Sequence, residues 1–156
     1  MTSSVSVYID APVEKVFDYY QDPDHQWAMM PEQSRRFIEL TDVKRTEGGI
    51  GTYTSWVYKI GPLRREAFDV VTEFVPNDHI TDRASQPVMG TMTTSFRAEG
   101  AGTRFTIERR PGSFWRFPPL DWLVVRLMTP VWMQSLSRLK AAVEQPTAGT
   151  RTRAAG

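Results

Sequence analysis

The chain has 156 residues, which is typical of one domain, and its 19 Lys and Arg nearly balance its 18 Asp and Glu. This balance argues against nucleic acid as a partner, and the absence of Cys excludes disulfides and thiolate metal sites. The first residues lack the basic and apolar segments of a signal peptide, so we expect a cytoplasmic protein.

The predicted elements begin with a strand and two short helices. Alternating apolar residues predict a strand over 5–10. An apolar stripe at helical spacing predicts a helix that begins near Pro12 and ends at Tyr20, with Pro12 in its first turn. A short helical segment over 25–30 follows, before Pro31.

Six strand-like runs come next, separated by turns rich in Gly, Pro, Asn and Asp. They cover residues 36–44, 51–60, 63–75, 79–84, 89–97 and 103–110. Because the links between consecutive runs are short, we expect them to form an antiparallel meander.

The most apolar stretch runs from Phe114 to Gln134 and holds three of the five Trp residues. Its length and the charge of Arg126 exclude a membrane span, and a long C-terminal helix, kinked near Pro130, fits better. The first half of this helix is apolar nearly all round, so it must be covered or must border a cavity or a partner. The remaining residues, 146–156, form a basic tail that we expect to be disordered.

Several motifs occur along this series of elements: IDAPVEKVF at 9–17, GIGT at 49–52, EFVP at 73–76 and GAGT at 100–103. Together they resemble the START-like or Bet v 1-like (SRPBCC) superfamily, of the polyketide cyclase/dehydrase and lipid-transport type. The resemblance implies an α+β helix-grip fold over residues 1–145, in which about seven strands wrap around the C-terminal helix. It also implies a cavity between sheet and helix for a small hydrophobic molecule, such as a lipid, a polyketide or an isoprenoid.

Alternation along the strands selects the side chains that would line this cavity. On 63–75 the apolar parity is that of Phe68 and Val70, which places Asp69 outside, beside solvent. On 51–60 the register is open, and Tyr53 or Tyr58 can face inward. The predicted ligand-binding set comprises Tyr53, Trp56, Tyr58, Phe68, Val70, Met92, Thr94, Phe96, Phe105, Ile107, Arg109, Trp115, Leu120, Val124, Leu127, Met128 and Val131. The same side chains can instead pack a solid core.

Arg109 has two interpretations. It shares the parity of Phe105 and Ile107, so it can point into the cavity, where it needs an anionic partner, or extend into solvent from the strand end. No catalytic residue is predicted, because His25 and His79 lie at turns and no nucleophile motif is present. No metal site or cofactor is expected, since no metal-ligand spacing occurs.

Three functions remain open at this point. The first is a carrier or sensor that binds a small hydrophobic molecule without chemistry. The second is a polyketide cyclase-like or aromatase-like enzyme, which would need an ionisable side chain inside the cavity, beside a Tyr or an Arg. The third is an interaction module that uses the Trp-rich half of the C-terminal helix to contact a partner or, peripherally, a membrane.

Overall fold

The computed structural model describes residues 2–85, 89–112 and 118–145, and in these the chain forms one antiparallel sheet of seven strands. The strand order is β1-β7-β6-β5-β4-β3-β2, so each strand of the meander lies beside its neighbour in sequence and β1 closes the series on β7. The strands are β1 (Ser3–Ile9), β2 (Ile38–Lys44), β3 (Tyr53–Ile60), β4 (Leu63–Val75), β5 (His79–Ala84), β6 (Thr91–Glu99) and β7 (Gly102–Arg110). The helices are α1 (Val13–Tyr20), α2 (Pro23–Met29), α3 (Glu32–Arg35) and α4 (Pro118–Glu144).

This arrangement confirms the predicted α+β helix-grip fold, with one short element added. The prediction ended the helical region at Pro31, but Pro31 caps a further turn, α3. Proline is tolerated there because the first amides of a helix need no intrahelical partner. Pro130 lies inside α4, which is one helix from Pro118 to Glu144. The predicted tail, 146–156, lies outside the described residues.

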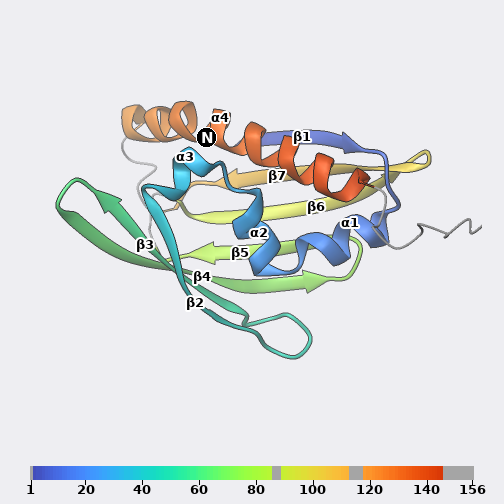
Figure 1. Ribbon diagram of the computed structural model, residues 1–156, viewed down its shortest axis with the longest axis horizontal. Coiled ribbons are helices and arrows are strands. Elements are labelled where there is room, and N and C mark those ends of the chain that lie inside the picture. The colour runs from blue at the N-terminus through green and yellow to red at the C-terminus, as the bar shows by residue number, and fades with distance from the viewer. Residues whose placement is uncertain (1, 86–88, 113–117, 146–156) are drawn as a thin grey trace, which may run out of the picture.

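The helices divide the concave face of the sheet between them (Figure 1). The C-terminal helix α4 lies along β1 at one edge, whereas α1 packs against β6 and β7, and α2 contacts both α1 and α4. We predicted that the C-terminal helix would cover the sheet. In the structure α1 covers the central strands β6 and β7, and α4 covers the edge at β1.

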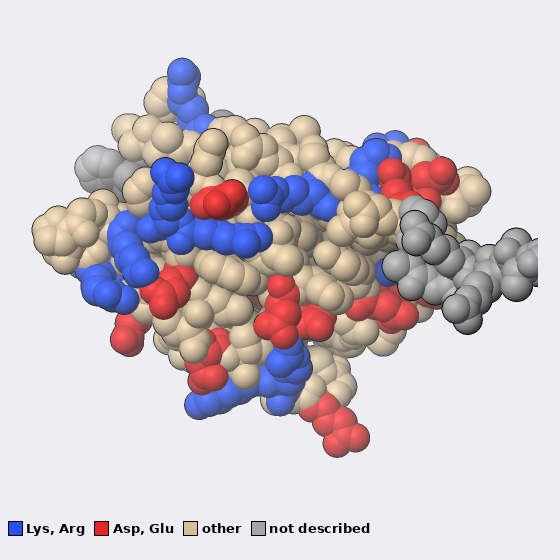
Figure 2. Space-filling model, viewed as in Figure 1, with Lys and Arg blue, Asp and Glu red and all other residues tan. Residues whose placement is uncertain are grey.

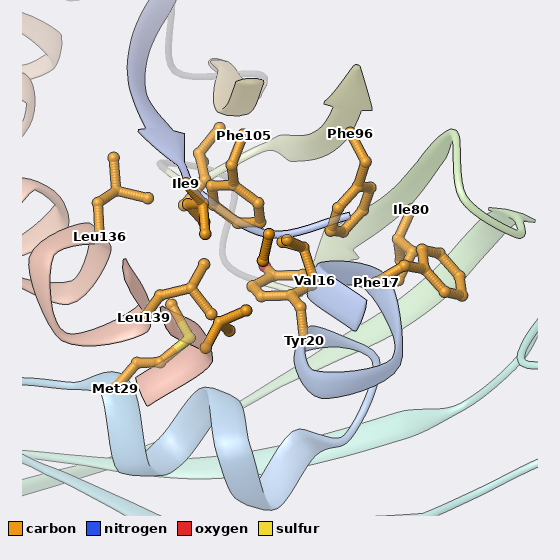
Figure 3. Close-up of a cluster of buried hydrophobic side chains, with 13 residues drawn as sticks. Ile9, Val16, Phe17, Tyr20, Met29, Ile80, Phe96, Phe105, Leu136 and Leu139 are labelled. Carbon is orange, nitrogen blue, oxygen red and sulfur yellow. The ribbon is translucent and has the colours of Figure 1, made fainter. Parts of the chain in front are cut away.

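Aromatic side chains fix α1 to the sheet (Figure 3). The rings of Phe17 and Tyr20 meet Phe96 edge-on at centroid distances of 5.1 and 5.7 Å. Tyr20 also meets Phe105 at 5.0 Å. Edge-to-face contacts of this kind add to the free energy of burial. Leu136, Leu139 and Val143 of α4 extend the same buried cluster toward β1.

A bulge in β4 decides which of its side chains face α1. The pairing of β4 with β5 shifts register between Val71 and Glu73, so one extra residue reverses the alternation there. Asp69, Val71 and Phe74 therefore share the concave face. Phe74 meets Phe17 at 5.4 Å on one side. On the other side it contacts Gly49, where a Cβ atom would lie 2.4 Å from the ring.

Candidate functional site

Two carboxyl groups lie on the concave face, among mostly apolar side chains. Asp69 of β4 pairs in register with Thr54 and Ala84. Asp82 of β5 pairs with Val71 and with Met92. The strand register places both aspartates on the concave face, which the helices cover, and both are partly buried.

Burial raises the pKa of both groups toward neutrality. The pKa of Asp69 rises to about 6, although the indole N–H of Trp56, which donates to its Oδ2 at 2.8 Å, opposes the rise. The pKa of Asp82 rises to about 7, first because of burial and second because of the negative charge of Asp69. Asp82 can therefore both take up and release a proton near pH 7.

Two tyrosines lie within the electrostatic influence of these carboxyl groups. The hydroxyl groups of Tyr20 and Thr94 form a buried hydrogen bond of 3.0 Å between α1 and β6. Burial raises the pKa of Tyr20 strongly, and the charge of Asp82 adds to the rise. Burial also raises the pKa of Tyr58 to about 12, with Asp69 as the second cause. Both phenols thus keep their protons at neutral pH, and the hydroxyl of Tyr20 is engaged with that of Thr94.

A cleft of about 420 Å³ reaches Asp82 from the surface. Its floor consists of Thr54, Val71, Phe74, Ile80 and Asp82, which belong to β3, β4 and β5. One wall is the junction of α1 and α2, and the other is the loop between β2 and β3. The volume lies within the range of small-molecule sites in proteins, and the floor is apolar except for Thr54 and Asp82.

A charged contact joins the two walls of this cleft. The guanidinium group of Arg45, from the β2–β3 loop, donates at 2.9 Å to both Asp22 and Asp24 at the start of α2. Burial alone would raise the pKa of Asp22, but the Asp24 N–H and Arg45 lower it below its usual range. Arg45 is therefore a fixed cation beside the cleft.

Arg109 is completely buried, so the structure contradicts its placement in solvent at a strand end. Its guanidinium group donates to Oδ1 of Asp121 at 2.7 Å. Asp121, from the first turn of α4, is the anionic partner that an inward Arg109 requires. Partial burial opposes ionisation of this carboxyl group, yet Arg109 lowers the pKa of Asp121 below its usual range.

The predicted ligand-binding residues separate into four groups, the last of which contains residues that do not face the site. Some face inward as predicted but lie within or beside the core, so their contact with a ligand stays a prediction: Trp56, Tyr58, Met92, Thr94, Phe96, Phe105, Ile107 and Arg109. Others lie on α4 and are partly buried: Val124, Met128 and Val131. Trp115 and the side chain of Leu120 lie outside the described residues.

Three predicted placements are wrong, those of Phe68, Val70 and Leu127, and the register left open on 51–60 places Tyr58 inward and Tyr53 outward. Phe68 and Val70 project from the convex face. The prediction gave them the same face as Phe74, but the bulge between Val71 and Glu73 reverses the alternation. Tyr53 also lies on the convex face, where its ring stacks on Phe68 at 5.1 Å. On α4, Leu127 is 62% exposed and points away from the sheet.

The same bulge brings Asp69 inside, although alternation had placed it beside solvent. Asp82 was missed altogether. Its signal was present in the sequence, since Asp82 alternates with Ile80 and Ala84 on β5. Tyr20 was assigned to the helix stripe, and its hydroxyl contact with Thr94 depends on the packing of α1 against β6.

The described part of the chain has neither a metal-ligand cluster nor a helix that could span a membrane. No three His, Cys, Asp or Glu side chains there are grouped in a way that could hold a metal ion. No helix among these residues is long and apolar enough to cross a membrane.

Known structures with this architecture match nearly the whole chain. A Chromobacterium violaceum protein superposes with a TM-score of 0.65 at 22% identity, covering 94% of this chain and 99% of its own. The di-domain ARO/CYC StfQ of the steffimycin biosynthetic pathway gives a TM-score of 0.70 at 13% identity. The match covers 92% of this chain and 50% of StfQ. The di-domain ARO/CYC BexL of the BE-7585A biosynthetic pathway gives 0.70 at 17% identity, with 94% and 50% covered.

At these identities the structural matches show a shared fold. A search of the curated proteins gives no match. The family model described as polyketide cyclase / dehydrase and lipid transport matches residues 1–144. This match spans every helix and strand described above, and it agrees with the predicted resemblance. The chain therefore belongs to the polyketide cyclase / dehydrase and lipid transport family.

Proposed function

We propose that the protein binds a small, largely apolar, carbonyl-bearing molecule in the 420 Å³ cleft and transfers protons on it. The observation that carries this proposal is the position of Asp82, a carboxyl group on the floor of the cleft whose pKa burial raises to about 7. A cyclase-like function required an ionisable side chain in the cavity beside a tyrosine. Asp82 supports such a function, because its charge acts on Tyr20, although its cleft lies beside α1 and not between the sheet and the C-terminal helix as predicted.

The chemistry follows from the two protonation states of Asp82. As a carboxylate, it removes a proton from the carbon beside a carbonyl group, and the electron pair of the broken C–H bond forms an enolate. The enolate carbon attacks a second carbonyl carbon of the same molecule, which forms a C–C bond and an alkoxide. The protonated Asp82 then returns its proton to the alkoxide.

A carrier without chemistry is the second candidate, and a specific observation favours it. Val71, Phe74 and Ile80 give the cleft an apolar floor, which suffices to bind a hydrophobic molecule. The family includes lipid transport in its description, which agrees with this alternative. In a carrier, the ionisation of Asp82 would regulate binding and no bond of the ligand would change.

Proton exchange on a probe ketone distinguishes the two candidates. Acetophenone is incubated with the protein in D2O near neutral pH, and the loss of its methyl proton signal is followed by NMR. We expect the wild type to accelerate exchange, and Asp82→Asn to lower that acceleration by about 100-fold or more. Asp18→Asn is the matched control, because Asp18 is an exposed carboxylate on the α1 wall of the same cleft. An unchanged rate in D82N would contradict the proposal, and ligand binding without exchange would favour the carrier.

A further inference from the structure

The β3–β4 hairpin ends in an exposed apolar tip. Ile60 and Leu63 pair directly across the turn, so their side chains project to the same face. They are 69% and 67% exposed. Phe37, which is 60% exposed, lies beside them because its carbonyl oxygen accepts a 2.7 Å hydrogen bond from the Lys59 N–H. Three large apolar side chains exposed at one place indicate an interaction surface.

Cations lie on both strands of this hairpin and at the end of α3, just before β2. Residues 35–39 and 59–66 contain five cations and two acids, which gives a local charge of +3 (five minus two), whereas the whole chain carries +1. The cations are Arg35, Arg36, Lys59, Arg64 and Arg65, and the acids are Glu39 and Glu66. Figure 2 shows Lys and Arg side chains gathered at the left end of the molecule, where the hairpin lies.

The two faces of the hairpin do not carry this charge equally. Arg64 and Arg65 are neighbours on β4, so they project to opposite faces and place a cation on each side of the tip. Glu39 offsets part of the charge on one face, since its carboxylate pairs with Lys59 and lies 3.8 Å from Arg64. Arg65 lies on the other face and is exposed.

A second apolar surface lies at the same end of the molecule. The first half of α4 and the β3–β4 hairpin both reach the left end of the long axis (Figure 1). On this part of α4, Trp122 and Leu127 are 60% and 62% exposed. The guanidinium group of Arg126 lies 5.2 Å from the Trp122 ring centroid. Tryptophan beside arginine suits the boundary between lipid headgroups and acyl chains.

We propose that this end of the molecule, formed by the β3–β4 hairpin tip, Phe37 and the first half of α4, docks on an anionic lipid bilayer. The aliphatic tip enters the headgroup region, and the cations around it meet the negative charge of the lipids. A second copy of the chain is a poorer occupant, because two tips of charge +3 would repel each other. Docking does not depend on the chemistry proposed for the cleft.

Co-sedimentation of the full chain with vesicles tests this proposal. The vesicles contain phosphatidylcholine alone or with about 30 mol % phosphatidylglycerol. We expect binding to the anionic vesicles only, weakened by salt. Ile60→Ser with Leu63→Ser should lower the partition coefficient about tenfold, because it removes the aliphatic groups that enter the bilayer. Arg64→Gln with Arg65→Gln should lower it about 30-fold, at roughly fivefold per cation.

Matched variants at distant exposed positions provide the controls. Ile50→Ser with Val75→Ser removes two apolar side chains that are 58% and 42% exposed, one in the β2–β3 loop and one at the end of β4 opposite the tip. Arg97→Gln removes an exposed cation of β6. These variants should bind like the wild type, and circular dichroism checks that all variants are folded. Absence of binding, equal binding to neutral vesicles, or unchanged binding of the hairpin variants would overturn the proposal. So would a hairpin-dependent dimer, seen by sedimentation velocity, that does not bind vesicles.

Discussion

Asp82→Asn should stabilise the protein at alkaline pH and leave its stability nearly unchanged in acid. Asparagine has nearly the shape of a protonated aspartate, but it cannot ionise among the apolar neighbours of the cleft floor. Burial raises the pKa of Asp82 from its ordinary value of 3.8 to about 7. At about 1.36 kcal/mol per pH unit, this difference corresponds to about 4 kcal/mol.

The direction of the effect follows from which state releases its proton first. Because the pKa of Asp82 is raised in the folded protein, the unfolded chain loses this proton at lower pH. The contribution of this group to stability is therefore present below about pH 4 and is lost as the pH rises through about 7. At about pH 8 the free energy of unfolding of the wild type should be about 4 kcal/mol lower than that of D82N.

Urea denaturation of both proteins at several pH values between about 4 and 8 measures this difference. Asp18→Asn is the control, because its carboxylate is exposed on the cleft wall and its loss should change stability by less than about 1 kcal/mol. Asp69→Asn should lower the pKa of Asp82, since the charge of Asp69 is the second cause of the rise. If the stability difference between wild type and D82N stayed the same across this range, Asp82 would be ionised throughout and the reasoning would be refuted.

Two other predictions concern the framework of the site. In thermal or urea denaturation, Gly49→Ala should destabilise the protein by about 2–3 kcal/mol more than Gly48→Ala. Both glycines have positive φ, but only a Cβ at Gly49 would overlap Phe74. An equal loss in the two variants would show that this close packing is absent. Arg109→Met should lower the free energy of unfolding by about 3–5 kcal/mol by removing the buried guanidinium group that pairs with Asp121, and adding Asp121→Leu should restore most of it. A double variant as unstable as R109M alone would contradict this account of the ion pair.

Much of the fold could be predicted because it depends on local periodicity. The strand alternation, the turn residues and the apolar stripe of α1 are each read within about ten residues of sequence, and they agree with one another. The bulge between Val71 and Glu73 could not be found in this way, because its position depends on the pairing of β4 with β5. This single residue moved Phe68 out of the predicted site and Asp69 into it.

The helix α4 shows a second limit of sequence-based prediction. Its first half is apolar nearly all round, so periodicity could not select the buried face. The structure buries Trp132 and leaves Trp122 60% exposed. The partner of Arg109 was equally hidden, because Asp121 follows it by twelve residues and meets it only when α4 closes over the end of β7.

Carbon-13 NMR titration of the aspartate side chains tests the central claim most directly, since it measures the proton occupancy of Asp82 in the folded protein. The signals are assigned from the D82N and D69N variants. The account predicts apparent pKa values of about 7 for Asp82 and about 6 for Asp69, with the two titrations coupled. Midpoints for both groups below about 4.5, close to those of exposed carboxyl groups, would contradict the claim that this cleft holds an acid–base group active at neutral pH.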